Sequence, residues 1–307
     1  MKVIVLGASG FIAFPIAQAF ARAGHIVYGT TRSAENAKAL ARDEILPIVC
    51  DATNDEGRAL WGKEAETADL IIDAIPSTTG AAPALATFKY ASAISDGRPV
   101  GAKITYIYTA GAWTQSRGPA GLAAWTSDTQ PHSGRVGLTT WRWGVEKEVL
   151  SSNAVNGIVI RPTLLYGKAG SLYSLFYFPA ALAAAQKGET FEAVAHPDLR
   201  LANIHPDDLA DLYLRVGERG PLLKGQTFVG SNQATERATD LLDAIVRVSG
   251  AKGYTIRPPS NAFEEAFCSS IVVKPSLGNA LTGWAPKKPS LVDGIDVYWA
   301  SFLAHQE

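Results

Sequence analysis

The sequence predicts an α/β fold in which a doubly wound parallel sheet is followed by a smaller C-terminal subdomain. A chain of 307 residues with a 47% apolar share can bury the large core that such a fold needs. Strand-like and helix-like patterns alternate up to about Tyr166, as in parallel sheets with helical crossovers. Beyond Tyr166 the alternation loosens. We therefore expect a sheet domain over residues 1–165 and a subdomain over 166–307, part of which returns to the sheet.

The N-terminal segment contains a complete β-α-β unit. Residues 2–6 form a short, β-branched apolar run before a glycine, which predicts a strand buried on both faces. An Ala-rich helical pattern follows over residues 15–23, with Pro15 in its first turn and Gly24 just past its end. A second strand is predicted over residues 25–31, so the whole unit fits into about 30 residues.

The alternation continues along the chain. Further strands are predicted over residues 45–50, 70–75, 103–108, 157–160 and 227–229. Helices are predicted over residues 34–42, 83–95, 138–151 and 239–249. Two more are predicted with only one defined end: one follows an aromatic segment at 172–178 and ends at 187, and the other begins at 206. A proline-rich tail without a predicted element follows. No repeat or low-complexity linker separates the halves, so we expect the C-terminal part to pack against the sheet.

Composition and charge narrow the kinds of partner. The net charge is −1, from 28 basic and 29 acidic residues without a block of like charge, which argues against nucleic acid and membrane partners. The N-terminus predicts a strand and no long apolar run occurs, so a cytoplasmic protein is expected. Cys50 and Cys268 are expected to be reduced, and the five histidines lack metal-ligand spacing. The expected partner is a small-molecule substrate, bound by a monomer or homodimer that holds no metal.

A glycine motif lies between the first strand and the first helix, where Gly7, Gly10 and Ala13 are three residues apart. Glycine at 7 permits a tight turn, glycine at 10 lets the backbone approach a pyrophosphate, and a small residue at 13 lets the helix pack close to the sheet. A glycine turn without a ligand is the alternative. In this β-α-β context the motif predicts a Rossmann-type site for a dinucleotide.

The end of the second strand indicates which dinucleotide binds. An acidic residue is expected near Thr31 when the adenosine ribose carries two free hydroxyls, but the sequence continues with Arg32. A guanidinium can bind a 2′-phosphate bidentately, which favours NADP over NAD, although Arg32 could also be a solvated loop charge. Asp51 follows the third strand, where it either accepts a hydrogen bond from the adenine amino group or forms a simple turn.

Several segments, in this order and spacing, resemble the short-chain dehydrogenase/reductase superfamily in its extended or atypical NAD-dependent epimerase/dehydratase branch. The matching segments cover the chain up to about Leu214: Gly7-Ala8-Ser9-Gly10-Phe11-Ile12, Cys50-Asp51-Ala52-Thr53, Ala74-Ile75-Pro76, Tyr108-Thr109-Ala110-Gly111, Arg161-Pro162-Thr163-Leu164-Leu165-Tyr166-Gly167 and Ile204-His205-Pro206-Asp207-Asp208-Leu209-Ala210-Asp211. The resemblance implies an NAD(P)-dependent oxidoreductase. Its cofactor-binding residues would be Gly7, Ser9, Gly10, Phe11, Ile12, Arg32, Asp51, Ala52, Ala74, Ile75, Pro76, Thr109 and Pro162.

The catalytic pair of that superfamily is absent. Its members that move hydride carry Tyr-x-x-x-Lys on the helix after the fifth strand, where the lysine lowers the pKa of the tyrosine. None of the ten tyrosines here has a lysine four residues on. Aligning the helix on Glu146 places Leu138 at the tyrosine position and Arg142 at the lysine position. Arg142 either bridges to the cofactor ribose or pairs with Glu146 on the helix surface, and Lys147 is expected to be solvated.

Other hydroxyls and one histidine are candidates for the missing chemistry. Thr109 either polarises the substrate carbonyl or has a structural role. Tyr166 is the first candidate for the proton donor, with Tyr173 and Tyr177 as further candidates, although aromatic rings in such a segment usually line a pocket or core. His132, in a loop between tryptophans, is a weaker candidate.

Three functions remain open at this point. The first is an NADP-dependent reductase of a small, largely apolar carbonyl, imine or activated alkene, with a non-standard proton donor. The scarcity of basic residues in 172–178 argues against a phosphorylated or nucleotide-sugar substrate. The second is a non-redox isomerase, cyclase or lyase on the same fold. The third is a cofactor-binding sensor without turnover.

Overall fold

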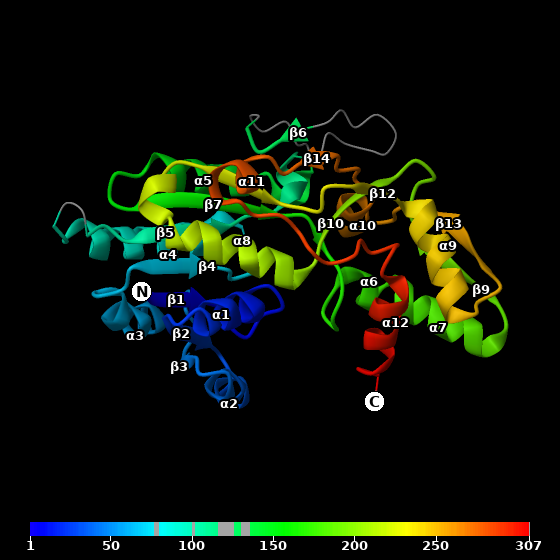
Figure 1. The fold of residues 1–307 in the computed structure, drawn as a ribbon, viewed down its shortest axis with the longest axis horizontal. Coiled ribbons are helices and arrows are strands. Elements are labelled where there is room, and N and C mark those ends of the chain that lie inside the picture. The colour runs from blue at the N-terminus through cyan, green and yellow to red at the C-terminus, as the bar shows by residue number, and fades with distance from the viewer. Residues whose placement is uncertain (77–79, 100–101, 116–125, 130–135, 307) are drawn as a thin grey trace.

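A seven-stranded parallel sheet forms the centre of the molecule (Figure 1). The computed structural model describes residues 1–76, 80–99, 102–115, 126–129 and 136–306. The strand order β11-β7-β5-β4-β1-β2-β3 reverses direction between β1 and β4, as in a doubly wound sheet. The strands are β1 (Lys2–Leu6), β2 (Ile26–Thr31), β3 (Leu46–Val49), β4 (Leu70–Asp73), β5 (Thr105–Thr109), β7 (Asn156–Pro162) and β11 (Thr227–Gly230). The predicted α/β fold class is confirmed.

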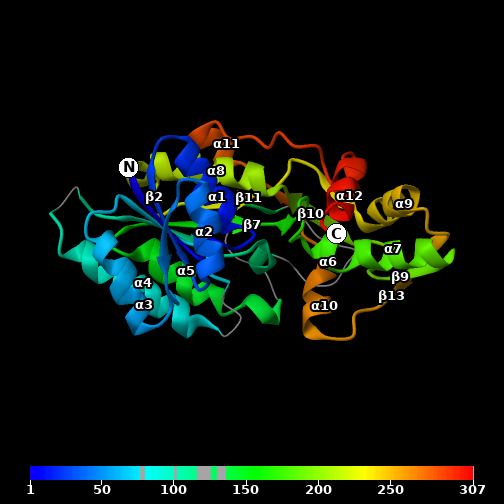
Figure 2. The same cartoon turned by 90° about the horizontal axis from the view of Figure 1, so that it is seen from below.

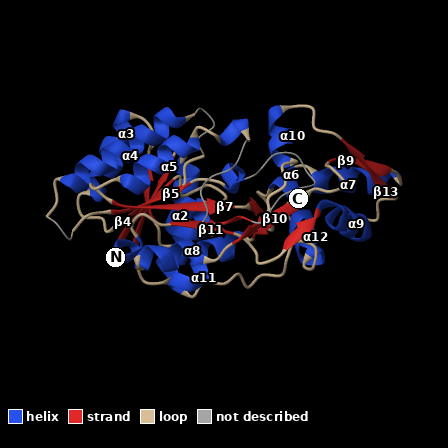
Figure 3. Cartoon of the chain, turned by 90° about the horizontal axis from the view of Figure 1, so that it is seen from above, coloured by secondary structure: helices blue, strands red, loops and turns tan. Residues whose placement is uncertain are grey.

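Helices cover both faces of this sheet (Figures 2 and 3). One face carries α3 (Asp55–Ala65), α4 (Ala81–Asp96) and α5 (Arg142–Ser151), and the other α1 (Ala13–Arg22), α8 (Pro206–Glu218) and α11 (Leu277–Thr282). Helix α2 (Ala34–Arg42) lies beside β3. Because both faces are covered, β4 and β5 are buried along their whole length, β1 and β4 are mostly apolar, and two separate cores flank the sheet. Helix α3 was not predicted from the sequence; it begins after Asn54, whose side chain caps it.

The C-terminal subdomain has a core of its own, at the right of Figure 1. Its helices are α6 (Leu172–Leu175), α7 (Tyr177–Lys187), α9 (Ala238–Ser249), α10 (Ala262–Phe267) and α12 (Ile295–Leu303), and β9 (Thr190–Val194) pairs with β13 (Gly253–Arg257). Two small sheets join β12 (Thr235–Arg237), β10 (Arg200–Ile204) and β8 (Leu164–Leu165), and β14 (Val273–Lys274) with β6 (Thr126–Ser127). Helix α12 lies in the tail for which no element was predicted.

Strand β11, helix α8 and the C-terminal tail come from the second half of the chain but pack with the main sheet. Strand β11 pairs in parallel with β7 at the edge of the main sheet, and α8 packs against α1. The backbone carbonyl of Asp208 on α8 accepts a hydrogen bond from the indole of Trp284, and its carboxylate accepts from the backbone N–H groups of Lys287 and Lys288. The tail is thereby fixed along α8. Across the described ranges, no helix is both long and apolar enough to cross a membrane.

Candidate active site

The glycine turn opens the site at the carboxyl edge of the sheet. Gly7 adopts a left-handed conformation (φ +77°) that favours glycine, and its N–H donates to the Thr30 side chain at 2.8 Å. The N–H of Gly10 donates back to the Gly7 carbonyl at 2.9 Å, and α1 begins at Ala13. The turn thus lies between β1 and the N-terminus of α1, as the spacing predicts.

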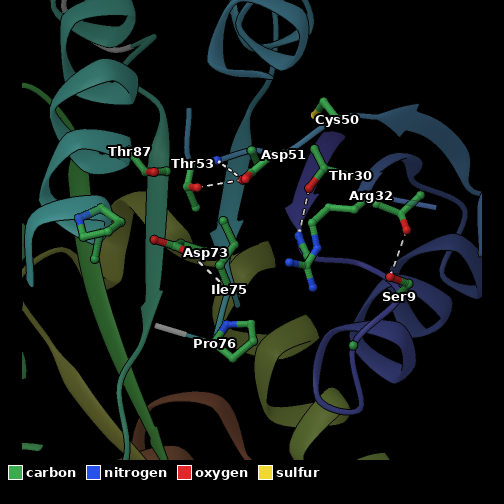
Figure 4. Close-up of a pocket in the computed structure, with 16 residues that line it drawn as sticks. Ser9, Thr30, Arg32, Cys50, Asp51, Thr53, Asp73, Ile75, Pro76 and Thr87 are labelled. Carbon is green, nitrogen blue, oxygen red and sulfur yellow. Dashed lines mark hydrogen bonds between the residues drawn. The ribbon is translucent and has the colours of Figure 1, made fainter. Parts of the chain in front are cut away.

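A first cavity of about 310 Å³ lies beside this turn, at the ends of β1 to β4 (Figure 4). It runs across to the inner side of α4. Of the residues predicted to bind the cofactor, it is lined by Gly7, Ser9, Gly10, Arg32, Asp51, Ala52, Ile75 and Pro76. Further residues on its wall that had not been predicted are Thr30, Thr31, Cys50, Thr53, Asp73, Pro83, Ala84 and Thr87. Half of these directly adjoin a predicted position in the sequence, so the motifs located the cavity and missed part of its wall.

Arg32 supplies the positive charge of the first cavity. Its exposed side chain points into the cavity, on the side where Ser9 and Thr31 share a hydrogen bond of 3.0 Å (Figure 4). Opposite, Asp51 accepts two hydrogen bonds from Thr53 on one carboxylate oxygen. These bonds, assisted by the charge of Arg32, lower the pKa of Asp51. The cavity therefore offers a guanidinium at one side and an ionised carboxylate with a free oxygen at the other.

Asp73 is a buried carboxyl group on the wall of the first cavity, at the end of β4. It is 3% exposed and accepts hydrogen bonds from the Tyr106 hydroxyl at 2.9 Å and the Ile75 N–H at 3.2 Å. Burial raises its pKa. Nearby on α4, the buried Thr87 hydroxyl has no hydrogen-bond partner among the described residues. The only sequence signal for Asp73 was an acidic residue ending an apolar strand.

A second cavity of about 410 Å³ continues from the first, and the two share Gly10 and Pro76. It lies between the ends of β5 and β7 and the start of α6. Of the predicted residues, Phe11, Ile12, Ala74, Arg142 and Pro162 line it. The rest of its described wall is made by Ala110, Gly111, Ala112, Trp113, Thr139, Thr163, Leu164, Leu165, Gly170, Ser171, Leu172 and Ile271. Except for one guanidinium and a few hydroxyls, this wall is apolar.

Arg142 is the only charged side chain that the described residues contribute to the second cavity. Its Nη1 donates to the Tyr108 hydroxyl at 3.1 Å and to the Thr109 carbonyl at 3.3 Å. The guanidinium lies over the Trp141 ring, with its carbon 4.5 Å from the ring centroid. Glu146, the alternative partner from the sequence, forms a buried ion pair with Arg161 instead. Arg142 is therefore held at the cavity by β5.

The hydroxyl groups on this wall have already used their protons. Thr139 donates to the Val136 carbonyl and Thr163 to the Gly230 carbonyl. Ser171 shares a hydrogen bond with Ser174, whose own proton goes to the Lys168 carbonyl, so Ser171 is the donor in that pair. The side-chain donors without a partner among the described residues are the free nitrogens of Arg142 and the buried indole N–H of Trp113.

Thr109 does not line either cavity. It is 8% exposed on the opposite face of β5 from Tyr108, and its hydroxyl accepts a hydrogen bond from Tyr213 of α8 at 2.7 Å. The expected role as carbonyl polariser or cofactor ligand therefore does not match its side-chain position, although its carbonyl holds Arg142. At this point of the cavity wall stand Ala110 and Gly111, which carry no hydroxyl.

The three candidate tyrosines are buried away from both cavities. Tyr166 donates to the Pro289 carbonyl at 2.7 Å and accepts from Asn232 at 3.1 Å, and its ring packs between His205 and Tyr298. Tyr173 donates to the Asn203 side chain, and Tyr177 to the Val194 carbonyl. Burial raises the pKa of all three. These positions do not match the prediction that one of them delivers a proton.

Two other expectations have different outcomes. His132 lies outside the described residues. Lys147 is exposed on α5, as expected for a solvated side chain. Among the residues that the structure describes, no group of three or more His, Cys, Asp or Glu side chains is placed to hold a metal ion.

Comparison with known proteins shows similarity in structure without detectable similarity in sequence. No family model and no curated protein matches the chain. Among solved structures, dTDP-glucose 4,6-dehydratase from Bacillus anthracis in complex with NAD superimposes with a TM-score of 0.80 at 12% identity, covering 100% of this chain and 97% of that one. UDP-glucose 4-epimerase from Thermotoga maritima with UDP-glucose gives a TM-score of 0.78 at 15% identity, covering 100% of both chains. UDP-glucuronic acid 4-epimerase from Bacillus cereus with NAD gives 0.78 at 13% identity, also over 100% of both.

At these identities the likeness establishes the fold. The chain has the Rossmann-type fold of these dehydratase and epimerase structures over its whole length. The resemblance seen in the sequence motifs is thus confirmed for the fold.

Proposed function

We propose that the protein is an NADP-dependent reductase that acts on a small, largely apolar carbonyl, imine or activated alkene. The observation that carries this proposal is the pair of cavities that meet at Gly10, where the strand order of the sheet reverses and ligands of open α/β folds bind. The first cavity fits an adenosine phosphate and the second a nicotinamide with a substrate beside it. Solved structures with this fold contain NAD.

The residues of the first cavity fit the adenosine half of a dinucleotide. The glycine turn places backbone N–H groups at the start of α1, where a pyrophosphate is stabilised by the helix dipole. Asp51 has a carboxylate oxygen free to accept from an adenine amino group, and the unpartnered hydroxyl of Thr87 offers a further hydrogen bond. These features are the same for NAD and NADP.

Arg32 supports NADP as the preferred form. An acidic side chain at the end of β2 would accept hydrogen bonds from the two ribose hydroxyls of NAD and repel a 2′-phosphate. Arg32 stands near that point with Ser9 and Thr31 as neighbouring hydroxyls. The guanidinium, and the one hydroxyl proton that the bond between Ser9 and Thr31 leaves free, provide charge and hydrogen-bond donors for a phosphate.

The bound cofactor supplies the hydride, and the chain's own residues must bind, orient and stabilise charge. Arg142 faces the second cavity with a permanent positive charge, which stabilises negative charge that develops on a substrate oxygen. It cannot release a proton at neutral pH. Since the other described side-chain donors of this wall are already bonded or very weak acids, water is the proton source in this proposal.

A non-redox reaction on the same site is the second candidate. Leu138 stands in place of the usual tyrosine, and Ala110 and Gly111 in place of a hydroxyl-bearing residue, so the standard machinery of hydride transfer is missing. An isomerase, cyclase or lyase could dispense with that machinery.

One experiment separates these functions. Purified protein is incubated with NADPH and a panel of apolar aldehydes, ketones, imines and enones while cofactor absorbance and substrate are both followed. A reductase consumes NADPH and substrate in equal amounts, and Arg142→Gln slows it. Conversion of a substrate without consumption of NADPH would select the non-redox function. NADPH binding with neither reaction would leave a sensor.

A further inference from the structure

We propose that the second cavity selects an apolar 2-oxo acid whose carboxylate is bound by Arg142. This inference rests on the proposed reductase function, because it names the class of substrate that would be reduced. The wall is apolar except for Arg142 and hydroxyl groups whose protons are used inside the protein. A lone guanidinium on an apolar wall is best matched by a ligand that is apolar at one end and anionic at the other.

The acidic groups around Arg142 form their hydrogen bonds and ion pairs with other residues. Glu146, on the same helix, is 0% exposed and forms an ion pair of 2.5 Å with Arg161. Asp73, from β4, is buried at 3% exposure with hydrogen bonds to other groups. Burial raises the pKa of Asp73, and the positive charge of Arg142 acts in the opposite direction. Arg142 is therefore the one charged side chain that the described residues place on the wall of this cavity.

The orientation of Arg142 leaves part of its hydrogen-bonding fork available. Both of its contacts to β5 are made by Nη1, and its plane is fixed over the Trp141 ring. Within the described parts of the chain, Nη2 and Nε have no partner. These two nitrogens lie on one edge of the guanidinium, the edge that binds a carboxylate in bidentate fashion.

Aromatic side chains extend the apolar wall toward the surface. The Trp113 ring on this wall stands edge-on to Phe263, with centroids 6.0 Å apart, and Phe263 lies 5.7 Å from Phe176. Phe263 and Phe176 line a separate, smaller cavity, so Trp113 is the aromatic ring beyond Phe11 that faces the second cavity itself. A ligand bound to Arg142 through a carboxylate would find these two ring surfaces for an aromatic or aliphatic body.

The chemistry balances with the groups named so far. The carbonyl carbon next to the carboxylate gains a hydride from NADPH, which is oxidised to NADP⁺. The electron pair of the broken C=O π bond moves to the oxygen, which takes a proton from water. The product is a 2-hydroxy acid, and the positive charge of Arg142 faces both the carboxylate and the developing alkoxide.

Binding of phenylpyruvate and of its methyl ester to the NADP⁺-loaded protein tests the proposal by isothermal titration calorimetry. We expect the acid to bind about 10- to 100-fold more tightly than the ester, since hydrogen bonds between charged groups are worth about 1.5–3 kcal/mol. Arg142→Gln should remove this preference with little effect on the ester, and Arg142→Lys should retain part of it. Arg247→Gln, which removes a positive charge on α9 far from the cavity, should leave the preference intact.

Three results would overturn the proposal. They are equal binding of acid and ester to the unchanged protein, a preference that survives in a folded Arg142→Gln variant, and a variant that loses only NADP⁺ affinity, as a ribose ligand would. Turnover separates this proposal from the reductase function. Tight binding of the acid without NADPH oxidation would keep the carboxylate site and remove the reductase, whereas faster reduction of the ester would do the reverse.

Discussion

The two cavities open on the same edge of one sheet, yet they are built in different ways. The first is formed by residues that directly follow β1 to β4, together with one face of α4. The second combines the glycine turn with the ends of β5 and β7, the start of α6 and, from the far end of the chain, Ile271. A cavity made from strand ends can be located from local patterns, but one assembled by tertiary packing cannot.

The two cavities also differ in how many charged and polar side chains line them. The first contains Arg32, Asp51 and Asp73 and several hydroxyls, whereas the second has Arg142 as its one described charge. The first therefore fits a polar ligand that is held at many points. The second fits a ligand held by shape and a single charged group, so replacing one residue there changes selectivity more than fold.

The largest expected effect comes from closing the first cavity where it meets the second. In Gly10→Asp, a Cβ would already lie 3.2 Å from the Gly7 carbonyl, and the carboxylate would occupy the pyrophosphate position. Like charges in contact cost several kcal/mol, so NADPH and NADH should both bind roughly 100-fold more weakly or not at all. Fluorescence titration measures this. The control is Gly144→Asp, where a side chain meets open space; unchanged binding in Gly10→Asp would remove the dinucleotide assignment.

A smaller and more selective effect is expected at Arg32. Arg32→Asp replaces the guanidinium by a repulsive carboxylate beside the position that we propose for the 2′-phosphate. NADPH binding should weaken roughly 10- to 100-fold, as the loss of charge-assisted hydrogen bonds implies, while NADH binding changes little. Arg42→Asp, at the exposed far end of α2, is the matched control. Equal losses for both cofactors would show that Arg32 does not select the phosphate.

Tyr166→Phe tests whether the reaction proposed for the second cavity needs the hydroxyl of the tyrosine that the sequence singled out. The hydroxyl bridges Pro289 and Asn232 inside the protein, so its loss should cost about 1 kcal/mol of stability. Turnover should remain unchanged. Thermal unfolding and kcat are measured together, with Tyr298→Phe as the control because its hydroxyl binds the same Pro289 carbonyl. A fall in kcat of about 10²-fold or more would make Tyr166 the acid after all.

The smallest effect concerns Asp73 and the pH. Because burial raises its pKa in the folded state, the folded protein holds this proton more tightly than the unfolded chain does. The stabilisation is complete below the unfolded pKa and is lost as the pH rises through the folded pKa. Asp73→Asn should therefore raise the Tm more at about pH 8 than at about pH 4. The exposed Asp198→Asn is the control; a gain that is larger in acid would contradict the direction of the shift.

Local sequence patterns located the main sheet and its first two helices, α1 and α2, well. The bounds of β1 and α2 agree with the prediction to the residue, because an apolar strand run and a serine cap define them locally. Helix α12 was missed, since prolines dominate the tail before it. This helix is stabilised by tertiary packing, because Trp299 and Phe302 are part of the core of the C-terminal subdomain.

The site could be predicted only where one strand end determines it. Tyr108 and Thr109 are neighbours on β5, so their side chains point to opposite faces, one toward Arg142 and the other toward Tyr213. Nothing in the sequence tells which of the two side chains lies toward Arg142 and the second cavity. Tyr166 was singled out because it lies in a segment that resembles a family motif. Its hydroxyl nevertheless points toward Pro289 of the C-terminal tail.

Strand β11 has a consequence for protein engineering. Since it forms the outer edge of the main sheet beside β7, a fragment cut after residue 165 would leave β7 with an unpaired, apolar edge. Such an edge promotes aggregation. A chimera that exchanges the C-terminal subdomain for that of a protein with the same fold must therefore keep α8 and β11, with the tail that Asp208 fixes, as part of the recipient scaffold. The part that can be exchanged is therefore continuous in space, but the retained segments divide it into separate stretches of sequence.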